Sequence, residues 1–395
     1  MTEKTDTPAI RFKGYSDTWE QRKVGEVSES YSGGTPSVGV KEYYGGQIPF
    51  IRSAEINSEI TELFLTEEGL KNSSARLVAV GDILYALYGA TSGEVGRARL
   101  KGAINQAILA IKPHTDYDSE YLAQWLRKSK HSIIETYLQG GQGNLSGTIV
   151  KELSVDFPSL KEQKAIGDFF RQLDNLITLH QRKYEKLHNI KKSMLEKMFP
   201  KNGSNVPEIR FKGFTEAWEQ RKFSELYAKS SEKNDGSIGM DKNITVATMQ
   251  FKEDVKVSTA EYLKTYYTFN LGDIAFEGHQ SKEFRYGRFV ENDIGNGIVS
   301  HIFAVFRPIR EYDLHFWKYA INNEALMQRI LSRSTKASTM MHDLVTNDFL
   351  NETFLVPSLD EQRRIGVFLD TLDHLITLHQ RELYKHLRYR ILKVR

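Results

Sequence analysis

Few side chains in this chain have the types and spacing that chemistry requires. A few acidic-x-lysine triplets have the residue types of a nuclease site. The example Glu162-Gln163-Lys164 falls in a long periodic helix without an identifiable acidic partner. His180 and His379 occupy equivalent positions of two such helices. A metal site needs more ligands near them. We therefore expect packed or paired histidines and no catalytic or metal site in this chain.

The motifs of nucleotide and methyl-transfer enzymes are missing from the sequence as well. It contains neither the G-x-x-x-x-G-K-[ST] phosphate loop of an ATPase motor nor an Asn-Pro-Pro-aromatic tetrapeptide. Zero cysteines exclude a disulfide framework and a thiolate metal site. A stand-alone enzyme is therefore the least favoured class.

The elements that would position any site are written twice. Residues 158–182 return as 357–381 with seventeen of twenty-five positions identical, and residues 8–27 return as 207–226. Both blocks have an offset of 199 (357 minus 158, 207 minus 8) in a chain of 395 residues. Short repeats that stack have much shorter periods. The sequence therefore predicts two copies of one unit, each with an opening segment, a divergent body and a closing helix.

Each closing segment has the apolar spacing of a long coiled-coil helix, with steps of three or four residues. Leaving such a seam exposed would cost more than a domain's net stability. The second copy supplies the partner, and a pseudo-twofold relation between the copies would run the two helices antiparallel. The predicted seam residues are Ile166, Phe169, Leu173, Leu176, Ile365, Phe368, Leu372 and Leu375.

Both bodies mix strand-like runs with one amphipathic helix, predicted over 119–139 in the first and 314–333 in the second. Trp125 and Trp317 fall in these helices and are expected in the core. The predicted fold class is α+β, with two mixed α/β domains separated by a pair of long antiparallel coiled-coil helices. The predicted limits are 1–157 for the opening segment and first body, 158–199 for the first helix, 200–206 for a linker, 207–356 for the second opening segment and body, and 357–395 for the second helix.

Composition sets outer limits on location and partners. The first residues are too charged for a signal peptide, and no apolar run approaches the roughly 20 residues of a membrane span. We expect a cytoplasmic protein. A net charge of +3 neither demands nor excludes a nucleic-acid partner.

The frame motifs resemble those of a known family. A WEQRK opening paired with a PSL.EQ..I...L..LD.LITLHQR closing, each present twice around unlike bodies, is similar to the specificity subunit of bacterial type I restriction-modification systems. GGTPS before YYGGQIPFI, and GDILYALYGATSG before INQAI, are similar to the family's target recognition domains. The resemblance covers nearly the whole chain and is weakest in the second body, where only the skeleton matches.

The resemblance implies a non-catalytic DNA-reading subunit. Each target recognition domain would read one half of a bipartite asymmetric site in double-stranded DNA, and the helices would set the spacing. The chain would dock two methyltransferase subunits and, through them, the restriction and translocase subunits. S-adenosylmethionine, ATP and Mg would be used by these partners, with no cofactor in this chain. The alternative is a two-headed coiled-coil scaffold that binds proteins rather than DNA.

DNA contacts should come from polar and cationic loop side chains, which reach base edges and phosphates. For any single one, a solvated loop position is the simpler explanation, but we expect the set to contain the reading face. The predicted residues are Thr35, Ser37, Arg52, Tyr88, Thr91, Ser92, Asn105, Gln106, Gln142 and Asn144 in the first body, and Lys229, Lys233, Gln280, Ser281, Lys282, Arg285, Arg288, Lys336 and Ser338 in the second.

The segments written alike in both copies are the predicted docking surface for two equal partners, because equal partners need equal surfaces. Arg22 and Arg221 represent this surface. The alternative is that the repetition only preserves packing. The bases that are read and the length of the spacer are not encoded in any pattern of this kind.

Overall fold

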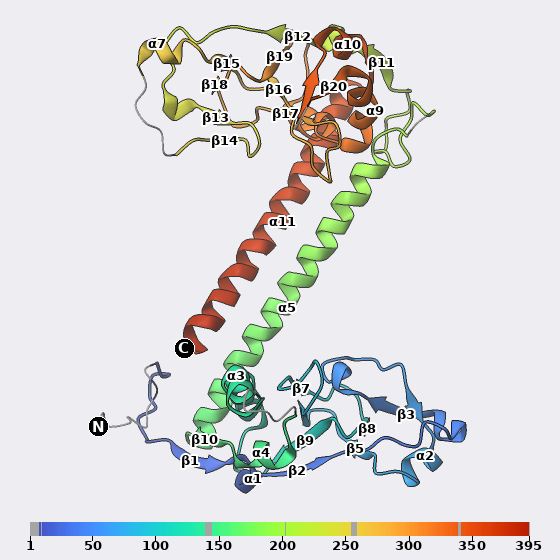
Figure 1. Cartoon of the computed structure of the whole chain (residues 1–395), viewed down its shortest axis with the longest axis vertical. Coiled ribbons are helices and arrows are strands. Elements are labelled where there is room, and N and C mark those ends of the chain that lie inside the picture. The colour runs from blue at the N-terminus through green and yellow to red at the C-terminus, as the bar shows by residue number, and fades with distance from the viewer. Residues whose placement is uncertain are drawn as a thin grey trace. The chain divides into compact units, whose positions relative to one another are not determined.

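A computed structural model describes residues 8, 10–138, 144–201, 203–253, 259–338 and 341–394. The chain forms two compact units, shown in Figure 1. Unit 1 comprises Met1–Leu179 with Leu383–Arg395, and unit 2 comprises His180–Glu382. Each long helix therefore contributes one part to each unit.

Unit 1 is built around a four-stranded antiparallel sheet in the order β2-β9-β6-β7. A second four-stranded sheet, β4-β3-β8-β5, includes a parallel β3–β8 pair, and β1 pairs antiparallel with β10. The strands are β1 Glu20–Lys23, β2 Ser28–Ser32, β3 Tyr44–Ile51, β4 Phe64–Leu65, β5 Arg76–Val78, β6 Ile83–Ala86, β7 Val95–Arg97, β8 Gly102–Ile104, β9 Ile108–Pro113 and β10 Ser154–Phe157. The helices are α1 Val24–Val27, α2 Glu67–Lys71, α3 Ser119–Leu138, α4 Gly147–Glu152 and the first part of α5 Leu160–Lys197, with 3-10 turns η1 Lys41–Tyr43 and η2 Ser53–Glu55.

Unit 2 repeats the principal sheet in the same order, β12-β19-β16-β17, and the same end pairing, β11 with β22. Its remaining strands form two-stranded pairs, β13 with β14, β15 with β18 and β20 with β21. The strands are β11 Glu219–Lys222, β12 Tyr227–Ser230, β13 Ile244–Thr245, β14 Gln250–Phe251, β15 Tyr267–Phe269, β16 Ile274–Glu277, β17 Arg288–Glu291, β18 Gly297–Val299, β19 Ala304–Pro308, β20 Thr335–Ala337, β21 His342–Leu344 and β22 Thr353–Val356. The helices are α6 Phe223–Leu226, α7 Ala260–Leu263, α8 Leu314–Ile321, α9 Glu324–Ser334, α10 Thr346–Asn351 and α11 Leu359–Val394, with the 3-10 turn η3 Met240–Lys242.

The predicted fold class is confirmed: two mixed α/β domains are combined with two long helices that run antiparallel. In unit 2, His180 of α5 lies 3.0 Å from His379 of α11, and Lys191, farther along α5, lies 2.6 Å from Asp373, which is earlier in α11. In unit 1, Arg390 lies 3.1 Å from Asp174. The Arg390–Asp174 pair repeats Lys191–Asp373 at the offset of 199 (390 minus 191, 373 minus 174).

The predicted seam residues differ in their burial. Leu173, Ile365 and Leu372 are buried, whereas Leu176 is 40% exposed. The other four, Ile166, Phe169, Phe368 and Leu375, are partly buried. Among the described helices none has the length and hydropathy of a membrane span.

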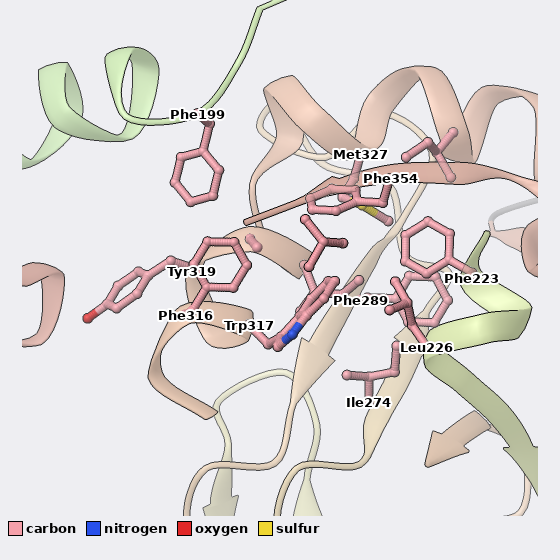
Figure 2. Close-up of a cluster of buried hydrophobic side chains, with 14 of the residues drawn as sticks. Phe199, Phe223, Leu226, Ile274, Phe289, Phe316, Trp317, Tyr319, Met327 and Phe354 are labelled. Atoms are coloured by element: carbon pink, nitrogen blue, oxygen red, sulfur yellow. The ribbon is translucent and has the colours of Figure 1, made fainter. Parts of the chain in front are cut away.

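One predicted helix of the second body is two helices. The helix predicted over 314–333 is interrupted at Asn322 and Asn323, where α8 ends and α9 begins. The Asn323 side chain accepts a hydrogen bond from the amide of Ala325 at 3.0 Å, which is an N-cap interaction that ordinary helical continuation would not provide. Trp317 of α8 is buried in the core cluster of Figure 2, as expected, and Trp125 of α3 is partly buried.

Candidate nucleic-acid interface

Polar side chains of unit 1 gather at the end of the principal sheet where β2 and β6 finish and β9 begins. The Thr35 hydroxyl donates to Oε1 of Gln106 at 2.5 Å, which joins the loop after β2 to the loop before β9. The Leu87 amide donates to the Ala107 carbonyl at 2.8 Å, and the Leu145 amide donates to the Leu87 carbonyl at 3.0 Å. These backbone bonds place the neighbouring Tyr88, Gln106 and Asn144 at one end of the sheet. Together with Thr35 and Asn105, these residues form what we call cluster 1.

A glycine allows the first of these loops to approach. A Cβ at Gly33 would lie 1.8 Å from the carbonyl oxygen of Ile104, so no larger residue fits between this loop and β8. The Gly34 amide donates to that same carbonyl at 3.2 Å. The two glycines of the GGTPS motif therefore let the loop pack closely against the backbone of β8. Thr35 and Ser37 follow these glycines and are exposed at the surface.

Unit 2 brings together predicted residues at the equivalent sheet end. The His342 amide donates to the Gly278 carbonyl at 2.8 Å, just as the Leu145 amide donates to Leu87 in unit 1. This bond joins the loop after β16 to the β20–β21 hairpin. The exposed side chains on these two segments, which we call cluster 2, are Gln280, Ser281, Lys282, Arg285, Lys336 and Ser338.

Several predicted residues already have protein partners. Arg52 pairs with Glu55 at 2.8 Å and with Glu62 at 2.9 Å, and hydrogen bonding to these carboxylates raises the pKa of its guanidinium. Arg288 bonds Glu277 and the Ala247 carbonyl, both at 2.8 Å.

The remaining predicted residues lie elsewhere or have only local contacts. Thr91 and Ser92 lie between β6 and β7, and Ser92 donates to the Leu87 carbonyl at 3.3 Å. Lys229 and Lys233 are exposed on β12 and just beyond it. Gln142 lies outside the described residues. Interface roles for all of these residues stay predictions.

Sequence reasoning missed a buried ion pair that occurs once in each unit. Arg11 Nε and Nη2 donate to the two carboxylate oxygens of Glu162 at 2.7 and 2.6 Å. Arg210 and Glu361 form the same bidentate pair at 2.7 Å for both bonds. Both glutamate side chains are 1% exposed. The signal was available, because both partners recur at the offset of 199.

The duplicated Glu-Gln dipeptide also ties each long helix to its body. The side-chain amide of Gln163 donates to the Pro158 carbonyl at 2.8 Å, and its oxygen accepts from the Asp118 amide at 2.8 Å. Gln362 repeats both bonds with Pro357 and Asp313 at 3.1 Å. We call the Arg–Glu pair and these glutamine bonds the frame lock. Much of the repetition therefore serves packing.

The predicted docking residues lie outside the frame lock. The Arg22 side chain, 49% exposed, pairs with Glu20 at 2.9 Å on β1. Arg221, 30% exposed, pairs with Glu219 and, at 3.3 Å, with Glu225. Exposed pairs of this kind contribute about 0–1 kcal/mol to stability. These arginines are consequently available to a partner at little cost to the fold.

No group of three or more His, Cys, Asp or Glu side chains in the described part of the chain is placed to hold a metal ion. A pocket of about 680 Å³ in unit 2 is lined by residues that include Trp218 and Arg221 of the opening segment, Tyr312, and Trp317 of α8. Unit 1 has an apolar pocket of about 540 Å³ next to the frame lock.

Comparison with known proteins gives a consistent result. A family model described as the type I restriction modification DNA specificity domain matches the chain twice, at residues 16–189 and 215–388. The MjaIX specificity subunit of Methanocaldococcus jannaschii is 30% identical over 189 residues, which are 46% of this chain and 44% of that protein. The MjaVIII specificity subunit of the same organism is 23% identical over 388 residues, 93% of this chain and 88% of that protein. The crystal structure of a type I restriction-modification S subunit from M. genitalium has the same fold, with a TM-score of 0.61, 14% identity and 98% of each chain covered.

Proposed function

Because the chain belongs to the family of type I restriction-modification DNA specificity proteins, we propose that it is the sequence-reading subunit of such a complex. Each unit reads one half of a bipartite, asymmetric site in double-stranded DNA through its polar sheet end. The surfaces that carry Arg22 and Arg221 dock two methyltransferase subunits, and restriction subunits join through these. This chain covers less than half of the length of the MjaIX specificity subunit. The proposed function is therefore argued from the two units of this chain and not from that relative alone.

One observation carries the proposal: the same sheet end carries different side chains in the two units. Cluster 1 offers hydroxyl, phenol and amide groups, whereas cluster 2 adds lysines and an arginine. Base edges are distinguished by donor and acceptor patterns, so unlike side chains on like scaffolds read unlike sequences. This arrangement supports a target whose two halves differ.

The chemistry of such a complex is assigned to the partners in this proposal. The methyltransferase subunits would bind S-adenosylmethionine, and the restriction subunits would use ATP and Mg. This chain contributes positioning, because a reader that fixes register on the duplex determines which adenine reaches the partner's active site.

A protein-binding scaffold is the competing assignment, and salt dependence separates the two. DNA binding through phosphate contacts weakens steeply as salt rises, because bound counterions are released. We expect the purified complex to lose affinity for duplex DNA by at least tenfold between 50 and 200 mM salt. A scaffold would show no preference for duplex DNA at either concentration.

Exchange of one body tests the assignment to half-sites. Residues 227–356 are replaced by the matching body of another family member, and methylated adenines are mapped in a host that carries the partner subunits. We expect a bipartite motif in which one half changes and the other is retained. The matched exchange of residues 28–157 should change the opposite half. A change in both halves from one exchange, or in neither, refutes the proposal.

A further inference from the structure

The charge of the chain is divided unevenly between the bodies and the closing segments. Residues 28–157 carry 12 Lys and Arg against 15 Asp and Glu, and residues 227–356 carry 15 against 17. Residues 158–199 carry nine Lys and Arg against five Asp and Glu, and residues 357–395 carry eight against five. The two bodies are therefore acidic, whereas the segments that form the long helices are basic.

Acidic bodies hold few of the cations that a bound duplex requires. DNA carries one negative charge for about every 1.7 Å of its axis, and Lys and Arg contacts to phosphates supply the affinity that does not depend on sequence. Cluster 1 contains no Lys or Arg, and cluster 2 contains only Lys282, Arg285 and Lys336. Further cations that hold the duplex are therefore expected outside the two clusters.

A group of cations without ion-pair partners lies on α5 within unit 2 (Figure 1). All four members are exposed, and none forms an ion pair with a residue that the structure describes. From the first member to the last, α5 rises by about 15 Å. These residues, which we call the basic stretch, are Arg182, Lys183, Lys186 and Lys192.

The basic stretch is directed mainly away from α11. The ammonium group of Lys191 in α5 lies 2.6 Å from Asp373 of α11, which marks the side of α5 that faces the other helix. Arg182 and Lys186 precede Lys191 by nine and five residues. At about 100° per residue they project from nearly the opposite side of α5, and the other two members flank that side. A ligand can therefore reach these side chains without disturbing the contact between the helices.

Little acidic charge is available to neutralise the basic stretch. Glu185 is the only acidic residue between Arg182 and Lys192, and its side chain accepts a hydrogen bond from Gln181 Nε2 at 3.3 Å. Like charges four residues apart, such as Arg182 and Lys186, destabilise a helix. The local sequence is therefore better explained by an anionic ligand than by the stability of α5.

We infer that the basic stretch contacts phosphates of the bound duplex without reading its bases. The inference rests on the proposed function and assigns a partner to a surface outside both clusters. Guanidinium and ammonium groups bind phosphate oxygens whatever the base sequence is. The contribution of this surface is consequently equal for every duplex, and it decreases as salt rises because counterions are released on binding.

The test uses the full chain assembled with its methyltransferase subunits, and a variant in which all four residues of the basic stretch are replaced by glutamine. Glutamine has a helix propensity close to that of lysine and arginine, so α5 should be retained. Fluorescence anisotropy measures the affinity for a duplex that carries the methylated motif of the complex and for an unrelated duplex. We expect an equal loss of affinity for both duplexes. The slope of log K against log salt should become shallower by about 2–4, since each lost phosphate contact removes about 0.9.

The matched control removes the same residue types from the two bodies. All four control residues are exposed, and none forms an ion pair with a described residue. The net charge changes by the same amount as in the first variant, so any effect of net charge alone is shared. We expect the salt slope of the control to differ from that of the parent by less than about 1. The control substitutions are Lys71→Gln, Lys101→Gln, Lys252→Gln and Arg329→Gln.

Three results would overturn the inference and leave the proposed function standing. A salt slope that is unchanged, or that changes as much in the control, would assign the phosphate contacts to the partner subunits. A loss of affinity for the motif-bearing duplex alone would show that the stretch reads bases. Release of a methyltransferase subunit, detected by mass measurement, would make the stretch a protein dock. A parent complex that binds no duplex would refute the proposed function itself.

Discussion

At the scale of single residues, unit 2 contains a buried carboxyl group whose hydrogen bonds are not satisfied by the described residues. Glu291 of β17 is 3% exposed, and neither of its carboxylate oxygens has a hydrogen-bond partner among the described residues. Burial, together with the nearby Asp293, raises its pKa well above the ordinary value. The folded state therefore holds a proton that the unfolded state releases more readily, and folding loses stability as pH rises from about 4.3.

Glu291→Gln should consequently stabilise the protein at neutral and alkaline pH. We expect a gain of about 1–3 kcal/mol at pH 8, which shrinks to near zero at about pH 3, where the glutamate is protonated in both states. Melting temperature measured against pH gives the result. Asp273→Asn is the control, because Asp273 is also buried but pairs with Arg307 at 3.1 Å, and its loss should lower the melting temperature at pH 7. A gain for Glu291→Gln that is independent of pH would contradict the argument.

In the frame lock the buried carboxylate is paired, so we expect removal of its partner to lower stability rather than raise it. Arg210→Met should cost about 3–5 kcal/mol, since Glu361 would remain buried without its cation. The double variant with Glu361→Leu should recover most of this loss, because the buried charge is then gone. Urea denaturation followed by tryptophan fluorescence, to which the buried Trp218 contributes, measures both. A cost below about 1 kcal/mol for Arg210→Met would place the pair with ordinary surface ion pairs.

At the scale of elements, a glycine in each long helix sets how closely the helix approaches its body. A Cβ at Gly366 would lie 2.7 Å from the backbone amide nitrogen of Phe316 and 2.7 Å from Asp313 Oδ1. Gly167 meets the amide of Tyr121 at 3.1 Å and Asp118 Oδ1 at 2.8 Å in the same way. These glycines serve close contact rather than an unusual backbone conformation.

Gly366→Ala should destabilise unit 2 by about 1–3 kcal/mol, although alanine is the better helix former in isolation. The control is Gly39→Ala, where an added Cβ meets nothing within 4 Å. Thermal unfolding of the two variants decides the matter. Equal melting temperatures for both variants would show that α11 can move away from α8 without loss.

The elements that the sequence predicts well are those fixed by local spacing. The seam periodicity and the offset of 199 predicted both long helices and their antiparallel course. The break at Asn322 was missed because the apolar period continues through it while asparagine favours a cap. Clusters 1 and 2 depend on bonds between distant segments, such as Leu145 to Leu87, which no periodicity encodes. The sequence therefore identified candidate loops but not which of their residues meet.

At the scale of the whole molecule, two copies of one frame predict two docking events that are equal and separable. Arg22→Glu should abolish binding of one methyltransferase subunit, Arg221→Glu should abolish the other, and the double variant should bind neither. Stability should change by no more than about 1 kcal/mol, since both arginines form exposed pairs. Mass measurement of the assembled complex counts the partners. Two bound subunits in the double variant would exclude the opening segments as the dock.

The pairing of β1 with β10, and of β11 with β22, sets Glu20 opposite Phe157 and Glu219 opposite Val356. Each body therefore begins and ends at nearly the same point of the frame, because the two strands that flank it are paired with each other. Residues inserted into a body or lost from it change the length of that body but leave the pairing of the flanking strands unchanged. On the proposed function, we expect a body of another length and another specificity to fit between the same paired strands.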